Sequence, residues 1–119
     1  IGMSTLSDDV AYGMTKAMVD NFSDYEKGAP GAYGWALGQQ LSDFYLPSHA
    51  GTIRFLKEKG AWSAEAQANT DRQLQRQAVL SQAWTAHKGS NPSNFVTAWQ
   101  EARAKALLAA GFNPVFETW

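Results

Sequence analysis

The stretch Leu-Pro-Ser-His-Ala-Gly-Thr-Ile-Arg-Phe-Leu-Lys-Glu-Lys-Gly-Ala-Trp, residues 46–62, decides how this chain folds. Pro47 keeps the residue before it extended, and Ser48 can cap a helix that follows. Gly60 stands where a helix typically ends in a left-handed turn. The stretch therefore predicts a loop, a short helix over about 49–59, a tight turn and the start of a new helix.

Cap and breaker residues predict four more helices outward from this stretch. Ser7 followed by two acids is typical of a helix start, and Asn91 followed by Pro92 is another. No stretch alternates apolar and polar residues as a strand would. We therefore predict an all-α chain of about five helices in an irregular array, over about 8–24, 32–42, 49–59, 64–88 and 92–110, the second of them short and weak.

Composition limits the possible functions. The chain has 119 residues, 45% of them hydrophobic, so we expect at most one domain. A net charge of −1 gives no reason to expect nucleic acid or an anionic membrane as a partner. Cysteine is absent, which excludes disulfides and permits a cytosolic or a periplasmic location.

Two histidines are the sharpest candidates for chemistry. His49 lies in a loop at a helix start, where it could bind an anionic ligand or hold a hinge. Alternatively, its ring nitrogens could satisfy buried backbone groups, and we favour this second role. His87 lies near the end of a helix, where a cation is favoured by the helix dipole. Their spacing is not that of metal ligands, and no catalytic signature occurs. We expect no enzyme, no metal and no cofactor; a small hydrolase or lyase using His49 is a weaker alternative.

Arg54 lies on the predicted helix that follows His49. Its planar, charged fork suits a carboxylate partner. The alternative is an arginine whose side chain is simply solvated on an outer helix face, and we favour that alternative.

Three segments of the chain resemble motifs of one known family. Residues 46–62 resemble the Leu-Pro-x-His-Pro-Gly-Ala … Glu-x-Gly segment near the C-terminus of the TAXI family, the periplasmic solute-binding receptors of tripartite ATP-independent (TRAP) transporters. Residues 8–17 resemble that family's Asp-Val-Val-Tyr-x-x-Thr-Lys-Ala helix, and residues 62–65 are similar to its Trp-Thr-x-Glu. Ala50 stands where the family usually has proline, and Thr52 where it usually has alanine.

The resemblance implies that residues 1–119 are a single helical segment, the C-terminal portion of a two-lobed α/β periplasmic binding protein of type II-like fold. Such a receptor captures a small organic anion, a carboxylate or an amino acid, and delivers it to an ion-gradient-driven TRAP permease. This segment would mainly scaffold the lobe and the hinge. The resemblance places His49 and Tyr12 on the ligand side.

A fragment of a receptor would expose surfaces that evolved to face the missing part. The apolar stripes of the first and last helices would then leave a patch that drives association. We therefore expect the isolated chain to form a homodimer. The alternative function is a self-contained helical protein-interaction module that binds no small molecule.

Overall fold

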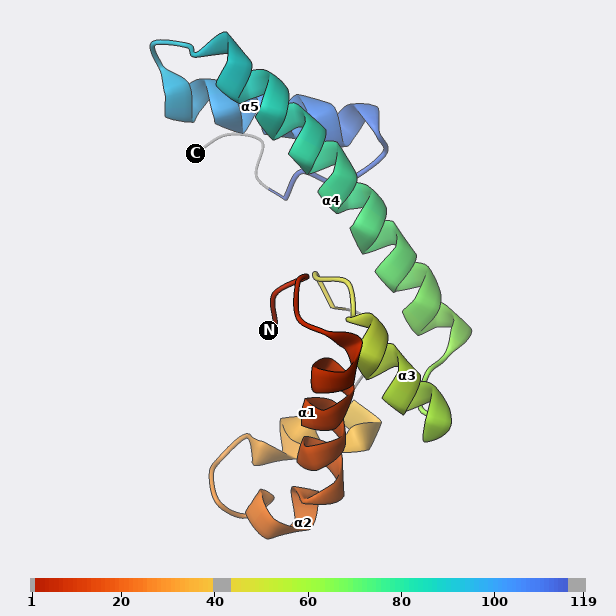
Figure 1. Cartoon of the computed structure of the whole chain (residues 1–119). Helices are drawn as coiled ribbons and strands as arrows, with labels where there is room; N and C mark the ends of the chain where they lie inside the picture. The colour runs from red at the N-terminus through yellow and green to blue at the C-terminus, as the bar shows by residue number, and fades with distance from the viewer. Residues whose placement is uncertain (1, 40–43, 116–119) are drawn as a thin grey trace. The chain divides into compact units, whose positions relative to one another are not determined.

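Helices make up the regular structure of the protein. A computed structural model describes residues 2–39 and 44–115, and it contains no strand within those ranges, so the all-α prediction is confirmed. The elements are labelled in Figure 1. In chain order they are α1 (Asp8–Asp20), α2 (Phe22–Tyr25), two 3-10 helices η1 (Ala32–Trp35) and η2 (Leu37–Gln39), α3 (Ala50–Glu58), α4 (Ala64–Ser90) and α5 (Phe95–Ala109).

The first predicted helix is interrupted where the sequence showed no breaker. Asn21 separates α1 from α2, and its backbone and side-chain amides both donate to the carbonyl of Ala17. An asparagine that bonds its own backbone in this way competes with helix continuation. In the next predicted segment, residues 32–39 form the two short 3-10 helices, and residues 40–42 lie outside the described residues.

The start of the last helix was predicted wrongly. Asn91 is not its cap, because that residue adopts a positive φ of 40° in the turn after α4. Asparagine tolerates this left-handed region better than most residues. The helix α5 begins only at Phe95, with Asn94 as the flanking residue.

Glycine ends two of the helices by the same hydrogen-bond pattern. Gly60, with φ 68°, follows α3, and the amide of Ala61 donates to the carbonyl of Leu56 over 2.8 Å. Gly111, with φ 76°, follows α5, and there Phe112 donates to Leu107 over 2.8 Å. These are Schellman motifs, which satisfy the last helical carbonyls. The predicted left-handed turn at position 60 is confirmed.

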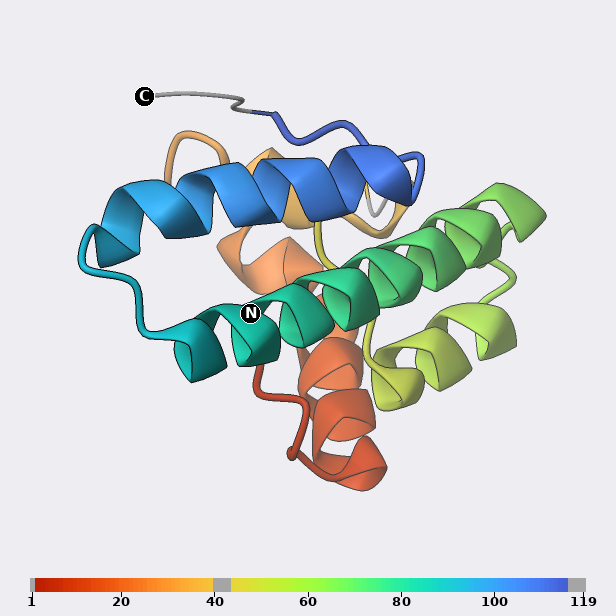
Figure 2. The ribbon, with the colours of Figure 1, turned by 90° about the horizontal axis from the view of Figure 1, so that it is seen from above.

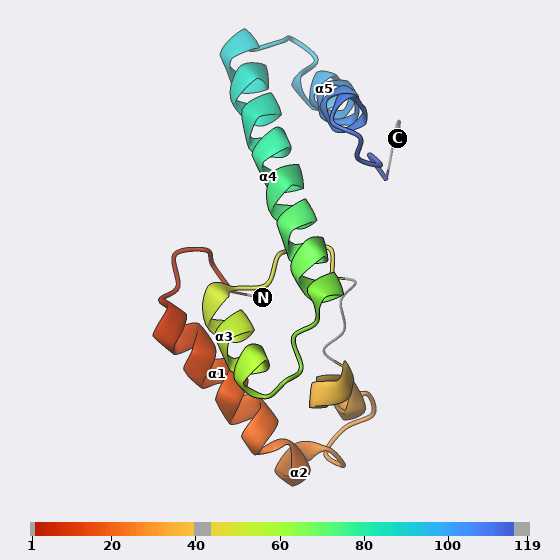
Figure 3. The same ribbon diagram turned by 90° about the vertical axis from the view of Figure 1, so that its right-hand side faces the viewer.

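The chain forms two compact units, Ile1–Asp71 and Arg72–Trp119, and α4 begins in the first and ends in the second. In the first unit α1 and α3 lie side by side, as Figures 1 and 3 show. Its core is small: Phe55, which is 1% exposed, and Leu56 are buried, and so are the alanines at positions 11, 32 and 66.

The second unit is a helical hairpin. After α4 the chain turns back into α5 (Figure 2), and the two helices meet through the rings of Trp84, His87, Phe95 and Trp99. Leu107 is fully buried there, and Ala104 and Phe112 are nearly so. Within the described part of the chain, no helix is long and apolar enough to cross a membrane.

Candidate functional site: the crossing of α1 and α3

Gly51, in the first turn of α3, allows the two helices to approach closely. A Cβ atom at this position would overlap the carbonyl oxygen of Asp8 and would lie 2.8 Å from the backbone nitrogen of Tyr12. Real Cβ atoms do not come so near to backbone atoms, and packed interiors have little room to shift. Only glycine therefore fits at this crossing.

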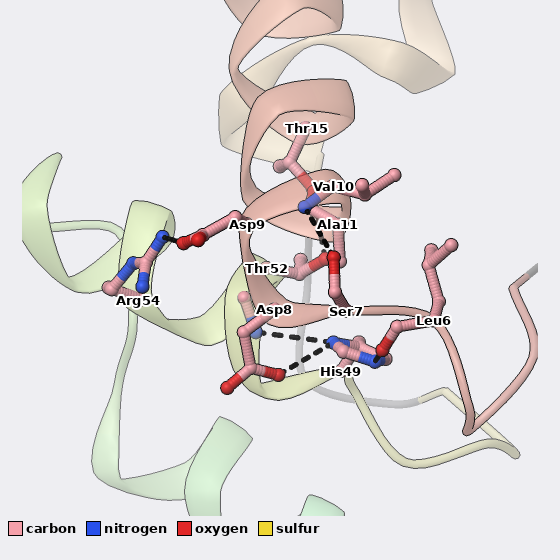
Figure 4. Close-up of polar contacts among 11 residues, drawn as sticks. Leu6, Ser7, Asp8, Asp9, Val10, Ala11, Thr15, His49, Thr52 and Arg54 are labelled. Carbon is pink, nitrogen blue, oxygen red and sulfur yellow. Dashed lines mark hydrogen bonds and ion pairs between the residues drawn. The ribbon is translucent and has the colours of Figure 1, made fainter.

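His49, and not Ser48 as predicted, caps α3, and it ties this helix to the segment that leads into α1. Its backbone is extended, and the Nδ1 atom accepts a hydrogen bond of 3.2 Å from the amide of Gly51. The Nε2 atom lies 3.0 Å from the carbonyl oxygen of Leu6 (Figure 4). A carbonyl can only accept, so Nε2 is the donor in this contact. Both nitrogens thus serve backbone groups, which is the role that the sequence favoured.

An acid stands beside this imidazole. The Oδ1 atom of Asp8 lies 3.6 Å from Nδ1 of His49, and the His49 side chain is 22% exposed (Figure 4). Asp8 also lies in the first turn of α1, where Ser7 accepts from the amide of Val10 and caps the helix. A negative side chain at this end of a helix is favoured by the helix dipole. His49 and Asp8 thus lie together where both helices begin. Whether His49 contacts a ligand stays a prediction.

Tyr12 lies in a row of polar contacts along the crossing. Its hydroxyl donates to Oε2 of Glu58 over 2.6 Å, and its ring meets Phe55 edge to face, with centroids 5.6 Å apart. The guanidinium of Arg54 lies 4.5 Å from the Tyr12 ring centroid. It also donates to Asp9 over 2.8 Å, as Figure 4 shows. Arg54 therefore pairs with a carboxylate, although its side chain is 47% exposed. The predicted ligand-side role of Tyr12 stays a prediction, since its described partners all lie within the chain.

Two threonines continue this row in a less exposed position. The hydroxyls of Thr15 and Thr52 lie 2.9 Å apart, and Thr15 also donates to the carbonyl of Ala11 over 2.8 Å. Thr52 can therefore donate to Thr15. We call the row formed by Asp9, Tyr12, Thr15, Thr52, Arg54 and Glu58 the α1–α3 seam.

The seam and the adjoining ion pairs shift several pKa values. The hydrogen bond to Glu58, with some burial, raises the pKa of Tyr12. The bond to Asp9 raises the pKa of Arg54. At the far end of α1, Lys16 and then Lys59 lower the pKa of Asp20, to which both donate.

These groups are exposed, and such pairs contribute little to stability in water. The close packing at Gly51 and Phe55 therefore holds the helices together, and the seam sets how they align.

Sequence reasoning missed most members of this site. It did not assign Gly51, Glu58 or Thr15 to a site, because none of these residue types is unusual on a single helix. Their contacts with the other helix become visible only in the fold. A signal was present in one case: a glycine inside a predicted helix costs roughly 1 kcal/mol and commonly marks a close backbone approach. Within the described ranges, no group of three or more His, Cys, Asp or Glu could hold a metal ion.

Comparison with known proteins matches residues 2–60 to the NMT1-like family. This family is of the periplasmic binding-protein type, and the match supports a solute-binding role in general. No curated protein and no solved structure gave a significant match. The matched range contains α1, α3 and the whole α1–α3 seam, and it ends at Gly60, the turn residue after α3.

Replacing Gly51 tests the crossing. We expect Gly51→Ala to lower the free energy of unfolding by about 2–3 kcal/mol or more, because the added methyl group meets backbone atoms that cannot rotate away. Urea unfolding followed by circular dichroism measures the change. Gly13→Ala in α1 is the matched control: a Cβ there meets nothing within 4 Å, so the variant should gain up to about 1 kcal/mol. Equal stability of Gly51→Ala and the parent would contradict the crossing.

Replacing Asp20 tests the ion pairs at the end of α1. The folded pKa of Asp20 lies below its ordinary value of 3.8, so its contribution to stability is present above that pH and disappears as the pH falls further. We expect Asp20→Asn to be less stable than the parent at pH 7, and the gap to close at acidic pH. Urea midpoints at a series of pH values measure it. Asp24→Asn is the control, because Asp24 has no ion pair among the described residues. A gap that is constant with pH would refute the assignment.

Proposed function

We propose that this chain is the C-terminal part of a periplasmic solute receptor, in which the α1–α3 pair braces a lobe and its hinge. The observation that supports this most is the match of residues 2–60 to a family of periplasmic binding-protein type. The matched segment is the one whose helices are locked by the crossing at Gly51. A scaffold of this kind needs rigid helices more than reactive groups, and the receptor is not an enzyme.

The finer proposal is a TAXI-family receptor of a TRAP transporter. It rests on the resemblance of residues 46–62 and 8–17 to that family's motifs. The proposed solute is a small organic anion, a carboxylate or an amino acid. The loaded receptor would deliver it to a permease driven by an ion gradient. The periplasmic location follows from the same resemblance.

His49 and Tyr12 are proposed to act on the ligand side as positioning residues. The ring of His49 ties Leu6 to the start of α3, and the hydroxyl of Tyr12 is held by Glu58 near the other end of that helix. Together the two side chains are proposed to fix the orientation of α1 relative to α3, and with it the position of the loops that lead into these helices. The solute contacts themselves are proposed to come mostly from elsewhere in the receptor.

The exposed face of α1 supports the idea that this unit packs against a further body. Val10 and Met14 lie four residues apart on one helical face and are 48% and 57% exposed. Apolar side chains in such a row normally meet a partner surface. In the receptor this would be the rest of the lobe, and in the isolated chain it would be a second copy.

A ligand screen tests the receptor proposal. The reading frame that contains residues 1–119 is expressed with whatever sequence precedes Ile1, and its thermal unfolding is followed against organic acids and amino acids. A bound solute at 100 times its Kd stabilises the folded protein by about 2.7 kcal/mol, which shifts Tm by several degrees. Neutral sugars serve as the control panel. A flat response to every anion would count against a receptor for organic anions.

A charge placed on the α1 face tests self-association. We expect the chain of 119 residues to sediment as a dimer at tens of micromolar, and Met14→Glu to raise the dimer dissociation constant by about tenfold or more, equal to about 1.4 kcal/mol. Met3→Glu makes the same change at a side chain that is 75% exposed and lies before α1, so it should leave the dimer unchanged. A parent chain that sediments only as a monomer would contradict self-association through the α1 face.

A further inference from the structure

The second unit carries an open trough between α4 and α5 that the proposed function does not use. Its volume is about 560 Å³. Alanines line it from both helices and present methyl groups in rows: Ala83 and Ala86 from α4, and Ala98, Ala102, Ala106 and Ala109 from α5. Spacings of three and four residues put each row on one helical face. The trough lies within residues 72–119, outside the range that matches the NMT1-like family.

The shape of the trough suits a helix better than a small molecule. Small-molecule sites enclose most of their ligand, whereas this trough is open to solvent. Alanine side chains let a neighbouring helix approach to the 8–10 Å axis separation of packed helices. A third helix laid between α4 and α5 would complete a small bundle.

The charge of this unit selects what kind of helix fits. Residues 72–119 carry a net charge of +3, with five basic side chains, Arg72, Arg76, Lys88, Arg103 and Lys105, against Glu101 and Glu117. Lys105 lines the trough and forms no ion pair among the described residues, although Glu101 precedes it by one helical turn. Two copies pairing trough to trough would bring like charges together. Acidic side chains beside the apolar face are the complementary partner.

His87 gives a second, independent indication. Its ring lines the trough and is 5% exposed, packed among Trp84, Phe95 and Trp99 with centroid distances of 4.3–5.9 Å. Its Nε2 atom is buried and has no hydrogen-bond partner among the described residues. An unsatisfied buried polar atom costs about 1–3 kcal/mol. An occupant that displaces the rings around His87 would give this nitrogen an acceptor.

We propose that the trough between α4 and α5 binds an amphipathic helix of a partner protein, with small apolar residues on the docked face and acidic residues on its flanks. Lys105 pairs with a flanking carboxylate, and the alanine rows receive the apolar face. This docking surface is independent of the solute-receptor proposal, because it rests on residues outside the matched range.

A designed peptide tests this docking surface with the whole 119-residue chain. The probe is a synthetic helix with alanine and leucine on one face and glutamate on both flanks. Binding is followed by tryptophan fluorescence, because Trp84 and Trp99 pack against His87 at the trough. We expect saturable binding that weakens with added salt, since the flanking pairs are solvent-exposed. Lysine in place of the glutamates should reduce the affinity by at least tenfold.

Variants of the chain identify the surface. Lys105→Glu should weaken binding of the acidic peptide by at least tenfold, and Lys105→Gln by a smaller factor with no change in helix content. Lys27→Glu makes the same charge change in the first unit and should leave the affinity within twofold. Absence of binding, equal loss in Lys27→Glu, or equal affinity for the lysine peptide would overturn the proposal. So would binding to phosphatidylglycerol vesicles that depends on Lys105 when the peptide does not bind.

Discussion

The close approach of α1 and α3 at Gly51 is the contact on which the first unit depends. Because no side chain separates the backbones there, short side chains such as Thr15 and Thr52 can reach each other directly. A larger residue at the crossing would move the helices apart by more than a hydrogen bond tolerates. The packing at Gly51 thus comes first, and the polar contacts of the α1–α3 seam follow from it.

Local signals predicted local structure well. The cap before α1, the loop before α3 and the left-handed Gly60 all depend on residues within four positions of one another, so the sequence states them directly. The prediction failed where two local choices compete. Asn21 and Asn91 each could continue, cap or break a helix, and the backbone contacts that decide between these outcomes are not visible in a pattern of residue types.

The candidate site was only partly predictable, for a different reason. His49 stood out because it lies in a loop at a helix start, and Tyr12 because of a family resemblance. Their partners did not stand out. Glu58 lies 46 residues after Tyr12, and on its own helix it looks like any solvated acid. The partner of His49 is the backbone carbonyl of Leu6. Every residue has such a carbonyl, so the residue type gives no sign of this contact. Contacts between distant segments need the fold.

The two units differ in how completely their helices cover apolar surface, and this difference affects what each unit can bind. The first unit closes its crossing with glycine and buries Phe55 almost completely. The second surrounds His87 with aromatic rings and leaves alanine rows open on both helices. Each unit is small, and small domains bury a smaller fraction of their surface on folding than larger ones do. The family match covers residues 2–60, which lie within the closed unit. In the open unit Lys105 stands beside exposed methyl groups, and the proposed acidic helix would complement both the charge and the apolar surface.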